Sequence, residues 1–416
     1  MRFGILQRYV MGEIFRAFAL ALLTVTCVFV LLTVMTKAAS AGLGPSEILK
    51  LVPYLIPSSL PFTVPVALLF AATVVYGRLA SDNEVIAVKT AGMSAMVLIW
   101  PAILLSFFLS ISLSYLTATA IPMSSAAARQ VIYQNIEDLF YKKLKMDRVF
   151  DVPEWPFLIK VKDVEDRVLL GATFKQRADK PNPAVAMPGI GAPASAAYQM
   201  IVQSTEATIR FDFEHKKVVI HFKDADISRS GMEPSEGIVR DTSFDFDIPG
   251  NGQFGGSEKM LEEMTVAEMR AKEVYFREKI VSERKHQSIA AAWYMASGRI
   301  RLIPWNEIQA AFGKYDYWAG QISKIETEIQ NRLAMAWGSL FFVVLGAPVG
   351  ILFARRDFLS AFISCFMPII LVYYPLMLFG TNLGKEGIVN PMTVWAGNGV
   401  LWVAAWFWAL PPVLKR

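Results

Sequence analysis

Histidine, cysteine and carboxylate clusters are where chemistry could occur, and this chain has few of them. Its only histidines are His215, His221 and His286. A strand would carry His215 and His221 on one face, where zinc ligands could meet. Two histidines without a third nearby ligand are more typical of a surface than of a zinc site. No metal site is therefore predicted.

Motifs that bind nucleotide or activate a nucleophile are missing from the sequence. It contains no GxxxxGK[ST] phosphate loop, no HExxH helix and no GxSxG turn. The two cysteines, Cys27 and Cys365, lie in apolar stretches, and neither a disulfide framework nor a CxxC metal site is available. We therefore expect no catalytic residue and no cofactor in this chain.

Long uncharged stretches dominate the rest of the chain. Six of them contain no Asp, Glu, Lys or Arg: 17–36, 51–77, 90–128, 333–354, 358–384 and 388–414. Each is long enough to cross the hydrocarbon core of a membrane, which takes about 20 apolar residues. The sequence therefore predicts six transmembrane helices, three on each side of a polar block of residues 129–331.

Basic residues are distributed unequally between the short loops. With the N-terminus in the cytoplasm, the inner side holds Arg2, Arg8, Arg16, Arg78, Lys89, Arg355, Arg356, Lys415 and Arg416, while only Lys37, Lys50 and Lys385 fall in short outer loops. The positive-inside rule favours this orientation, with both termini cytoplasmic and the central block outside. This bias explains the net charge of +5, and no basic stripe interleaved with aromatics indicates a nucleic-acid partner.

The uncharged stretches also limit how such a protein could be driven. They carry no Asp, Glu or His that could relay protons or bind a coupling cation, so transport driven by an ion gradient is disfavoured. Lys37 lies at the outer end of the first stretch. A lysine there can meet an anionic lipid headgroup or simply snorkel to the interface, and position alone favours the snorkelling anchor.

Residues 81–92 predict a short cytoplasmic helix between the second and third spans. Ser81 and Glu84 fit the S-x-x-E capping box. Lys89 lies at the negative end of the helix dipole, and Gly92 is well placed to end the helix. About ten residues make a helix of roughly 15 Å, too short to cross a membrane. Glu84 thus has two candidate roles, as a cap or as a contact for a partner on the inner face.

The polar block begins as a predicted sheet. Between about 149 and 250, apolar and polar residues alternate, as at Val218, Ile220 and Phe222. This pattern predicts half-buried strands in an antiparallel sheet or sandwich.

The remainder of the block differs in pattern. The Pro/Ala/Gly-rich segment 178–197 interrupts the strands and is not assigned a regular structure. From about 258 to 332 the sequence is helical in pattern and runs into the fourth span, with apolar residues at Ile322, Ile325, Ile329 and Leu333.

Several strings of the sequence are distinctive. GRLASDNEVIAVKTAGMS follows PSSLPFTVPVALLFAATVVY in the second span, and RYVMGEIFRAF lies near the N-terminus. EIQNRLAMAWGSLFFVVLGAPVGI, YYPLMLFG and NPMTVWAGN follow the polar block. Over nearly its whole length the chain resembles the LptF/LptG (YjgP/YjgQ) permeases of the lipopolysaccharide export machine. The GRLASDNE string and the proline-rich second span favour LptF slightly.

The resemblance implies a fold and a function. The fold is an α-helical polytopic membrane protein with six transmembrane helices (3+3) and an inserted periplasmic β-jellyroll domain. By residue, 1–128 would be the first transmembrane region, 129–257 the jellyroll, 258–332 a periplasmic helical segment and 333–416 the second transmembrane region. The function is that of an inner-membrane ABC permease subunit that extracts lipopolysaccharide, or a related anionic glycolipid, toward a periplasmic bridge.

The resemblance also implies partners and contact residues. The partners are an LptB-like ATPase dimer that binds the ATP, a paralogous LptF/LptG subunit and an LptC-like periplasmic protein. The short helix would enter a groove of the ATPase, with contacts from Arg78, Leu79, Asp82, Glu84, Ile86, Ala87, Ala91 and Gly92. The lipid cavity would lie between the two permease subunits, partly against the first and fifth spans, which makes Lys37 a candidate lipid contact.

The chain also departs from the usual family pattern. Segment 178–197 and the helical stretch around 270–320 make it longer than the usual member. Two other functions stay open: a mechanotransmission-type ABC permease for lipoprotein or peptide cargo, and a membrane-anchored scaffold that recruits envelope proteins. The first class usually has four spans, whereas six are predicted here.

Overall fold

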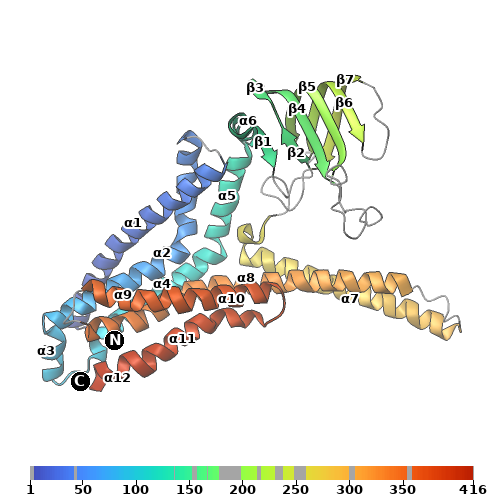
Figure 1. The fold of residues 1–416 in the computed structure, drawn as a ribbon. Helices are drawn as coiled ribbons and strands as arrows, with labels where there is room; N and C mark the ends of the chain where they lie inside the picture. The colour runs from blue at the N-terminus through green and yellow to red at the C-terminus, as the bar shows by residue number, and fades with distance from the viewer. Residues whose placement is uncertain are drawn as a thin grey trace, which may run out of the picture. The chain divides into compact units, whose positions relative to one another are not determined.

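The computed structural model is mostly helical, with one antiparallel sheet in the middle of the chain (Figure 1). It describes residues 4–41, 45–134, 136–151, 157–165, 167–177, 198–212, 217–229, 238–247, 259–298, 305–353 and 358–415. The chain forms two compact units. The helical unit comprises residues 1–32, 53–126 and 260–416, and the sheet unit comprises residues 33–52 and 127–259.

The N-terminal part of the chain is helical. Its elements are α1 (Ile5–Ala41), α2 (Pro45–Ser81), α3 (Glu84–Thr90), α4 (Met96–Ala118), α5 (Ala120–Gln134) and α6 (Ile136–Asp147). Helix α2 is continuous through Pro53, Pro57, Pro61 and Pro65. Membrane helices tolerate such prolines where neighbouring groups satisfy the freed carbonyls.

Helices return after the sheet. They are α7 (Val266–Ala296), α8 (Trp305–Leu352), α9 (Phe358–Pro368), α10 (Tyr374–Lys385), α11 (Ala396–Ala404) and α12 (Leu410–Lys415). Two π-helical turns join some of them, η4 (Ile369–Tyr373) between α9 and α10 and η6 (Ala405–Ala409) between α11 and α12. A 3₁₀ turn, η5 (Pro391–Trp395), precedes α11.

In the part of the chain that the structure describes, six helices are long and apolar enough to cross a membrane, by length and composition. They are Ile5–Thr36, Ile48–Ser81, Met96–Ala118, Ala311–Leu352, Phe362–Lys385 and Pro391–Val413. By the criteria of length and composition, the prediction of six membrane-spanning helices is confirmed. The fourth helix starts well before the uncharged stretch at residue 333, so it carries charged residues at one end.

Close backbone approach holds α2 against α8 in the helical unit. A Cβ atom on Gly350 would lie 2.9 Å from the carbonyl oxygen of Thr73 and 3.3 Å from the amide nitrogen of Gly77. Small residues at such crossings let two helices pack backbone to backbone. The buried Tyr76 hydroxyl donates to the Leu98 carbonyl at 2.7 Å and so ties α2 to α4 as well.

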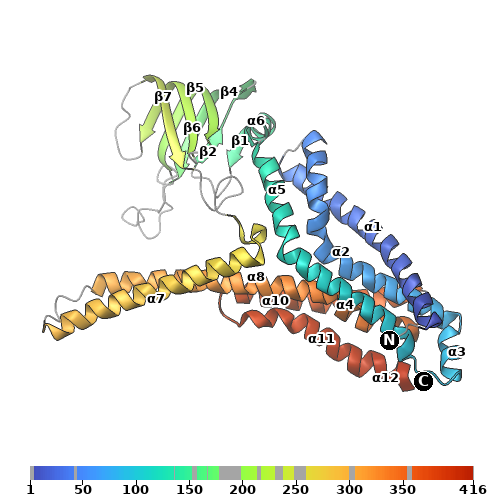
Figure 2. The same cartoon turned by 180° about the vertical axis from the view of Figure 1, so that it is seen from behind.

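Helix α7 and the first half of α8 lie side by side, as both ribbon views show (Figures 1 and 2). Helix α7 begins with a capping box between Thr265 and Glu268. The predicted helical stripe on α8 contacts α7: Ile325 and Ile329 are buried in one cluster with Met264, Met269 and Phe276, and Ile322 and Leu333 are partly buried beside it.

The described residues of the sheet unit form seven strands, all paired antiparallel. They are β1 (Val149–Asp151), β2 (Phe157–Lys160), β3 (Asp163–Glu165), β4 (Val168–Arg177), β5 (Tyr198–Asp212), β6 (Lys217–Arg229) and β7 (Ile238–Asp247). Their order is β1-β2-β4-β5-β6-β7, with β3 also paired to β4. The antiparallel sheet is confirmed, whereas a jellyroll is not. Segment 178–197 lies outside the described residues.

Helix α6 packs against the sheet within the same unit (Figure 1). Its Phe140 and Leu144 are buried in one cluster with Val218, Ile220 and Phe222 of β6, the residues whose alternation predicted the strand. Tyr141 secures this packing, because its hydroxyl donates to the Ile209 carbonyl at 3.0 Å and accepts from the Ile209 amide at 2.8 Å.

Candidate functional site: the short helix α3

Helix α3 follows α2 after a break of two residues, Asp82 and Asn83. Ser81 is the last residue of α2, so it does not cap the next helix. Asn83 occupies the N-cap position of α3 with a left-handed φ of 61°, and its side chain makes no capping hydrogen bond. Asparagine adopts this conformation more readily than most residues. The predicted capping box and the helix start at Ser81 are therefore wrong, and α3 has seven residues, starting at Glu84.

The other end of α3 agrees with the prediction. Gly92 has a positive φ of 79°. Its amide donates to the Lys89 carbonyl at 2.9 Å, and the Met93 amide donates to the Val88 carbonyl at 3.1 Å. These two bonds form a Schellman motif, in which glycine supplies the left-handed residue that ends the helix.

Helix α3 has one buried and one exposed face. Val85 and Val88 are buried in the same apolar cluster as the cores of α2 and α4. Ile86 is 52% exposed. Of the other predicted contacts in this segment, Glu84 is half-buried and the remainder are exposed: Asp82, Ala87, Ala91 and Gly92. The exposed face therefore combines an apolar side chain with a carboxylate at its edge.

The predicted contacts on α2 are placed differently. Leu79 is completely buried in the helical core and is not part of the exposed surface. Arg78 is half-exposed, and its guanidinium bonds to the Glu13 carboxylate of α1 at 2.6 Å. Glu13 also contacts Arg16 at 3.4 Å. Arg78 thus links the end of α2 to the start of α1.

A further contact joins α3 to the C-terminal helix. The Lys89 ammonium donates to the Val413 carbonyl in α12. Cations favour the carbonyl end of a helix, where the backbone acceptors lack partners within the helix. The sequence placed Lys89 at the negative end of α3 itself, but it could not show this bond across 324 residues of chain.

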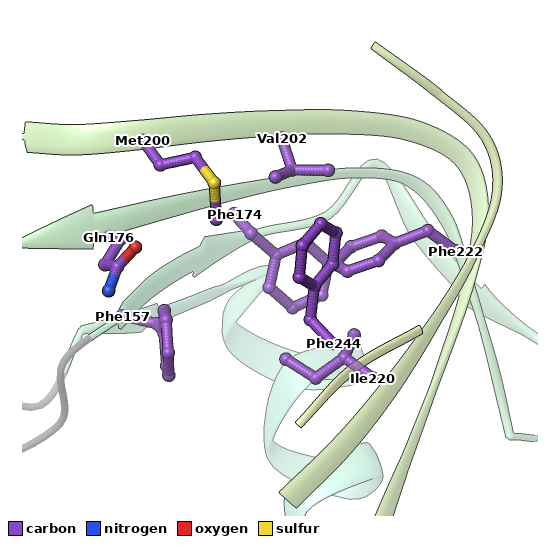
Figure 3. A pocket seen from close by; sticks show the side chains of 8 residues that line it. All are labelled: Phe157, Phe174, Gln176, Met200, Val202, Ile220, Phe222 and Phe244. Carbon is purple, nitrogen blue, oxygen red and sulfur yellow. The ribbon is translucent and has the colours of Figure 1, made fainter. Parts of the chain in front are cut away.

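A second feature that could act in function lies in the sheet unit (Figure 3). Eight side chains surround a small cavity in the sheet: Phe157, Phe174, Gln176, Met200, Val202, Ile220, Phe222 and Phe244. The Phe174 and Phe222 rings meet edge to face with centroids 4.8 Å apart. The cavity is about 10 Å³, room for roughly one water molecule. An acyl chain could enter only if the aromatic rings separated.

Comparison with known proteins identifies the family. The family model described as lipopolysaccharide export system permease LptF/LptG matches residues 8–411. The chain belongs to the LptF/LptG family. No curated protein matches the chain. The LptF/LptG family model covers both subunit types, so the slight preference for LptF stays a prediction.

Membership in the LptF/LptG family sets the general role of the chain. It is a permease of a lipopolysaccharide export system, a transport component rather than an enzyme. The six apolar helices agree with a multi-pass membrane protein of that family.

The remaining predicted positions of this LptF/LptG chain are Lys37 and the histidines. Lys37 lies in helix α1, but its side chain is outside the described residues. His215 is also outside them, whereas His221 lies on β6 opposite Ser243 and Thr208. Within the described ranges, no group of three or more His, Cys, Asp or Glu side chains could hold a metal ion.

Proposed function

We propose that this chain is the permease subunit that extracts lipopolysaccharide from the inner membrane, driven by ATP that a separate ATPase dimer hydrolyses. The observation that carries the proposal is helix α3, whose exposed face carries Ile86 and whose Glu84 carboxylate serves no capping box. A carboxylate beside an exposed apolar residue suits a partner groove that offers a cation and an apolar pocket.

Helix α3 is also connected so that a load on it reaches several spans. Val85 and Val88 pack into the core of the helical unit. Lys89 binds the end of the sixth span through Val413, and Arg78 binds the start of the first span through Glu13. In the proposed machine, movement of the ATPase against α3 therefore displaces the ends of the first, second and sixth spans together.

The packing of the spans supports a second permease subunit and a lipid path. In the most apolar window of the first and fifth spans, only 17% and 22% of residues are buried, against 61% for the second and fourth spans. The poorly covered spans carry large exposed apolar side chains, including Leu23, Leu31, Leu371 and Phe379. We assign these faces to the paralogous subunit and to the lipid that passes between the two.

The remaining parts of the proposal follow from the same assignment. The central block faces the periplasm, where the sheet unit passes lipid to an LptC-like partner, and both termini and α3 are cytoplasmic, as the positive-inside rule favours. Lys37 lies near the outer end of the first span, where a phosphate of lipopolysaccharide or a related anionic glycolipid could meet it. The chain binds no cofactor of its own in this scheme.

The test is co-purification of the ATPase with full-length variants from membranes. Glu84→Arg should abolish co-purification. Because Glu84 forms no capping box, Glu84→Gln removes the charge with little effect on helix start, and it should weaken the complex about tenfold or more, the worth of one charged hydrogen bond. Glu278→Gln, at an exposed carboxylate of α7, is the control and should change nothing.

The outcomes separate the alternatives. Normal co-purification of Glu84→Arg refutes α3 as the ATPase contact. A wild-type complex with neither an ATPase nor bound lipid indicates an envelope scaffold. An ATPase complex with lipoprotein or peptide cargo, and no glycolipid, indicates the mechanotransmission type of permease.

A further inference from the structure

A partly open cavity of about 360 Å³ lies within the helical unit, lined by residues of α2, α4, α5, α8, α10 and a 3₁₀ turn, η2 (Leu261–Glu263). Sites for small molecules and cofactors start at about 300 Å³. One side of this cavity is apolar, with Pro61, Phe62, Ile121 and Met335. The other side carries charged and amide groups, so the cavity is amphipathic.

Arg332 forms a fixed part of the charged wall. Its side chain is 10% exposed. Two of its nitrogens donate to the carbonyls of Leu261 and Met264, each at 2.7 Å, and its Nε donates to Glu328 at 3.3 Å. Because these acceptors occupy each nitrogen of the guanidinium, Arg332 positions the wall and has little capacity left for a ligand.

Lys385 is the group in this wall that can bind a ligand. Its ammonium lies 3.1 Å from the second Glu328 oxygen, and its side chain is 38% exposed. An ammonium has three N–H donors, so this contact leaves donors for an acceptor in the cavity. Asn331 also lines the cavity. Its side-chain amide lies 3.3 Å from the Thr381 hydroxyl, which donates its one proton to the Met377 carbonyl at 2.8 Å, and the amide NH₂ group has two N–H donors.

The charges of the cavity select the kind of ligand. The charged side chains that line the cavity are two cations, Arg332 and Lys385, and two carboxylates, Glu328 and Glu262, so the lining carries no net charge. Glu328 contacts both Arg332 and Lys385. Glu262 is exposed. A purely anionic ligand would meet Glu262, and a purely cationic one would meet Lys385 and Arg332. A ligand with both charges satisfies both sides.

We propose that this cavity binds one zwitterionic glycerophospholipid with an ethanolamine headgroup. Its phosphate accepts hydrogen bonds from Lys385 and Asn331, and its ammonium approaches Glu262. The first part of one acyl chain lies against Phe62 and Met335. The site is formed by one chain alone, and the proposal does not depend on the export function.

The test uses the full-length protein, purified alone into mixed micelles with equal amounts of phosphatidylethanolamine and phosphatidylglycerol of the same acyl chains. Native mass spectrometry identifies the retained lipid by its mass. The wild type should retain phosphatidylethanolamine preferentially. Lys385→Ala should weaken that retention about tenfold, and Glu262→Gln should shift the preference toward phosphatidylglycerol by a similar factor, because each removes a charged hydrogen bond.

Controls keep the result interpretable. Lys50→Ala removes an exposed lysine of α2 that does not line the cavity, and it should leave retention unchanged. If Lys385→Ala fails to fold, Glu262→Gln carries the test, because Glu262 is exposed. Equal retention of both lipids, a preference for phosphatidylglycerol or for a co-purified glycolipid, or wild-type behaviour of both variants overturns the proposal. No ATPase is present, so failure here leaves the export function untouched.

Discussion

Replacing Arg332 by methionine should destabilise the helical unit by about 3–5 kcal/mol. The guanidinium donates to the Leu261 and Met264 carbonyls at 2.7 Å each, and hydrogen bonds to charged groups contribute about 1.5–3 kcal/mol apiece. Methionine keeps much of the buried stem but leaves both carbonyls and part of Glu328 without their partner. Breaking a buried ion pair by removing one member costs a similar 3–5 kcal/mol.

The geometry also predicts that the two carbonyl bonds of Arg332 contribute more to stability than its ion pair with Glu328. The Arg332–Glu328 distance is 3.3 Å, longer than either carbonyl bond, and Glu328 keeps Lys385 as a second partner. Glu328→Gln should therefore cost less than Arg332→Met. The double variant should cost less than the sum of the two single changes by about 1 kcal/mol, the coupling expected for contacting residues.

Unfolding can be followed at Cys365, which is buried in the helical unit. In a Cys27→Ser background, the labelling rate of the Cys365 thiol in increasing denaturant reports the free energy of unfolding. Arg270→Met, at an exposed arginine of α7, is the control and should stay within about 0.5 kcal/mol of wild type. An Arg332→Met variant within about 1 kcal/mol of wild type, or a costlier Glu328→Gln, refutes the reasoning.

Two further changes test packing in each unit. Gly350→Ala should destabilise the helical unit by about 1–3 kcal/mol through overpacking, because the added Cβ would lie 2.9 Å from the Thr73 carbonyl oxygen. Gly399→Ala, which has no atom within 4 Å of its added Cβ, is the control and should be neutral or stabilising. Equal melting temperatures for the two variants would contradict the prediction. Tyr141→Phe should cost about 1–3 kcal/mol by removing both hydrogen bonds to Ile209. Faster hydrogen exchange in β5 checks this, and exchange at the wild-type rate would contradict it.

Local periodicity was sufficient for the strands and the long helices. The alternation at Val218, Ile220 and Phe222 places all three in the core of the sheet unit, because side chains of a strand point alternately to its two faces. The same pattern could not specify a jellyroll, since strand order depends on pairing between distant segments. It also missed the aromatic cavity, where Phe174, Phe222 and Phe244 come together from three strands.

The predicted capping box at Ser81 is wrong because Ser81 could either cap α3 or extend α2, and the extension of α2 is the more stable arrangement. An N-cap contributes about 1 kcal/mol. Extending α2 by one more turn buries Leu79 completely, and burying a leucine side chain is worth about 1.5–3 kcal/mol. Tertiary packing therefore outweighs the local cap, α2 continues to Ser81, and α3 starts at Glu84.

The charged cluster around Arg332 was missed for a different reason. Glu328 and Arg332 have the i,i+4 spacing of a helical ion pair, which the sequence does display. Their decisive partners are remote, since Leu261 lies 71 residues before Arg332. Treating the fourth span as starting at residue 333 also placed both residues outside it, although the helix itself begins at Trp305.

The late start of α3 changes what Glu84 can do. A carboxylate used in a capping box would be bonded to backbone amides and would offer little to a partner. Asn83 provides the turn by its backbone conformation alone, so the Glu84 charge is available at the edge of an exposed face. Helix α3 is held by Val85, Val88 and the Lys89 bond to α12, so in the proposed complex a partner bound to this carboxylate is connected to the core of the helical unit. If the proposed ATPase contact is right, the effect of Glu84→Gln on co-purification measures this charge alone.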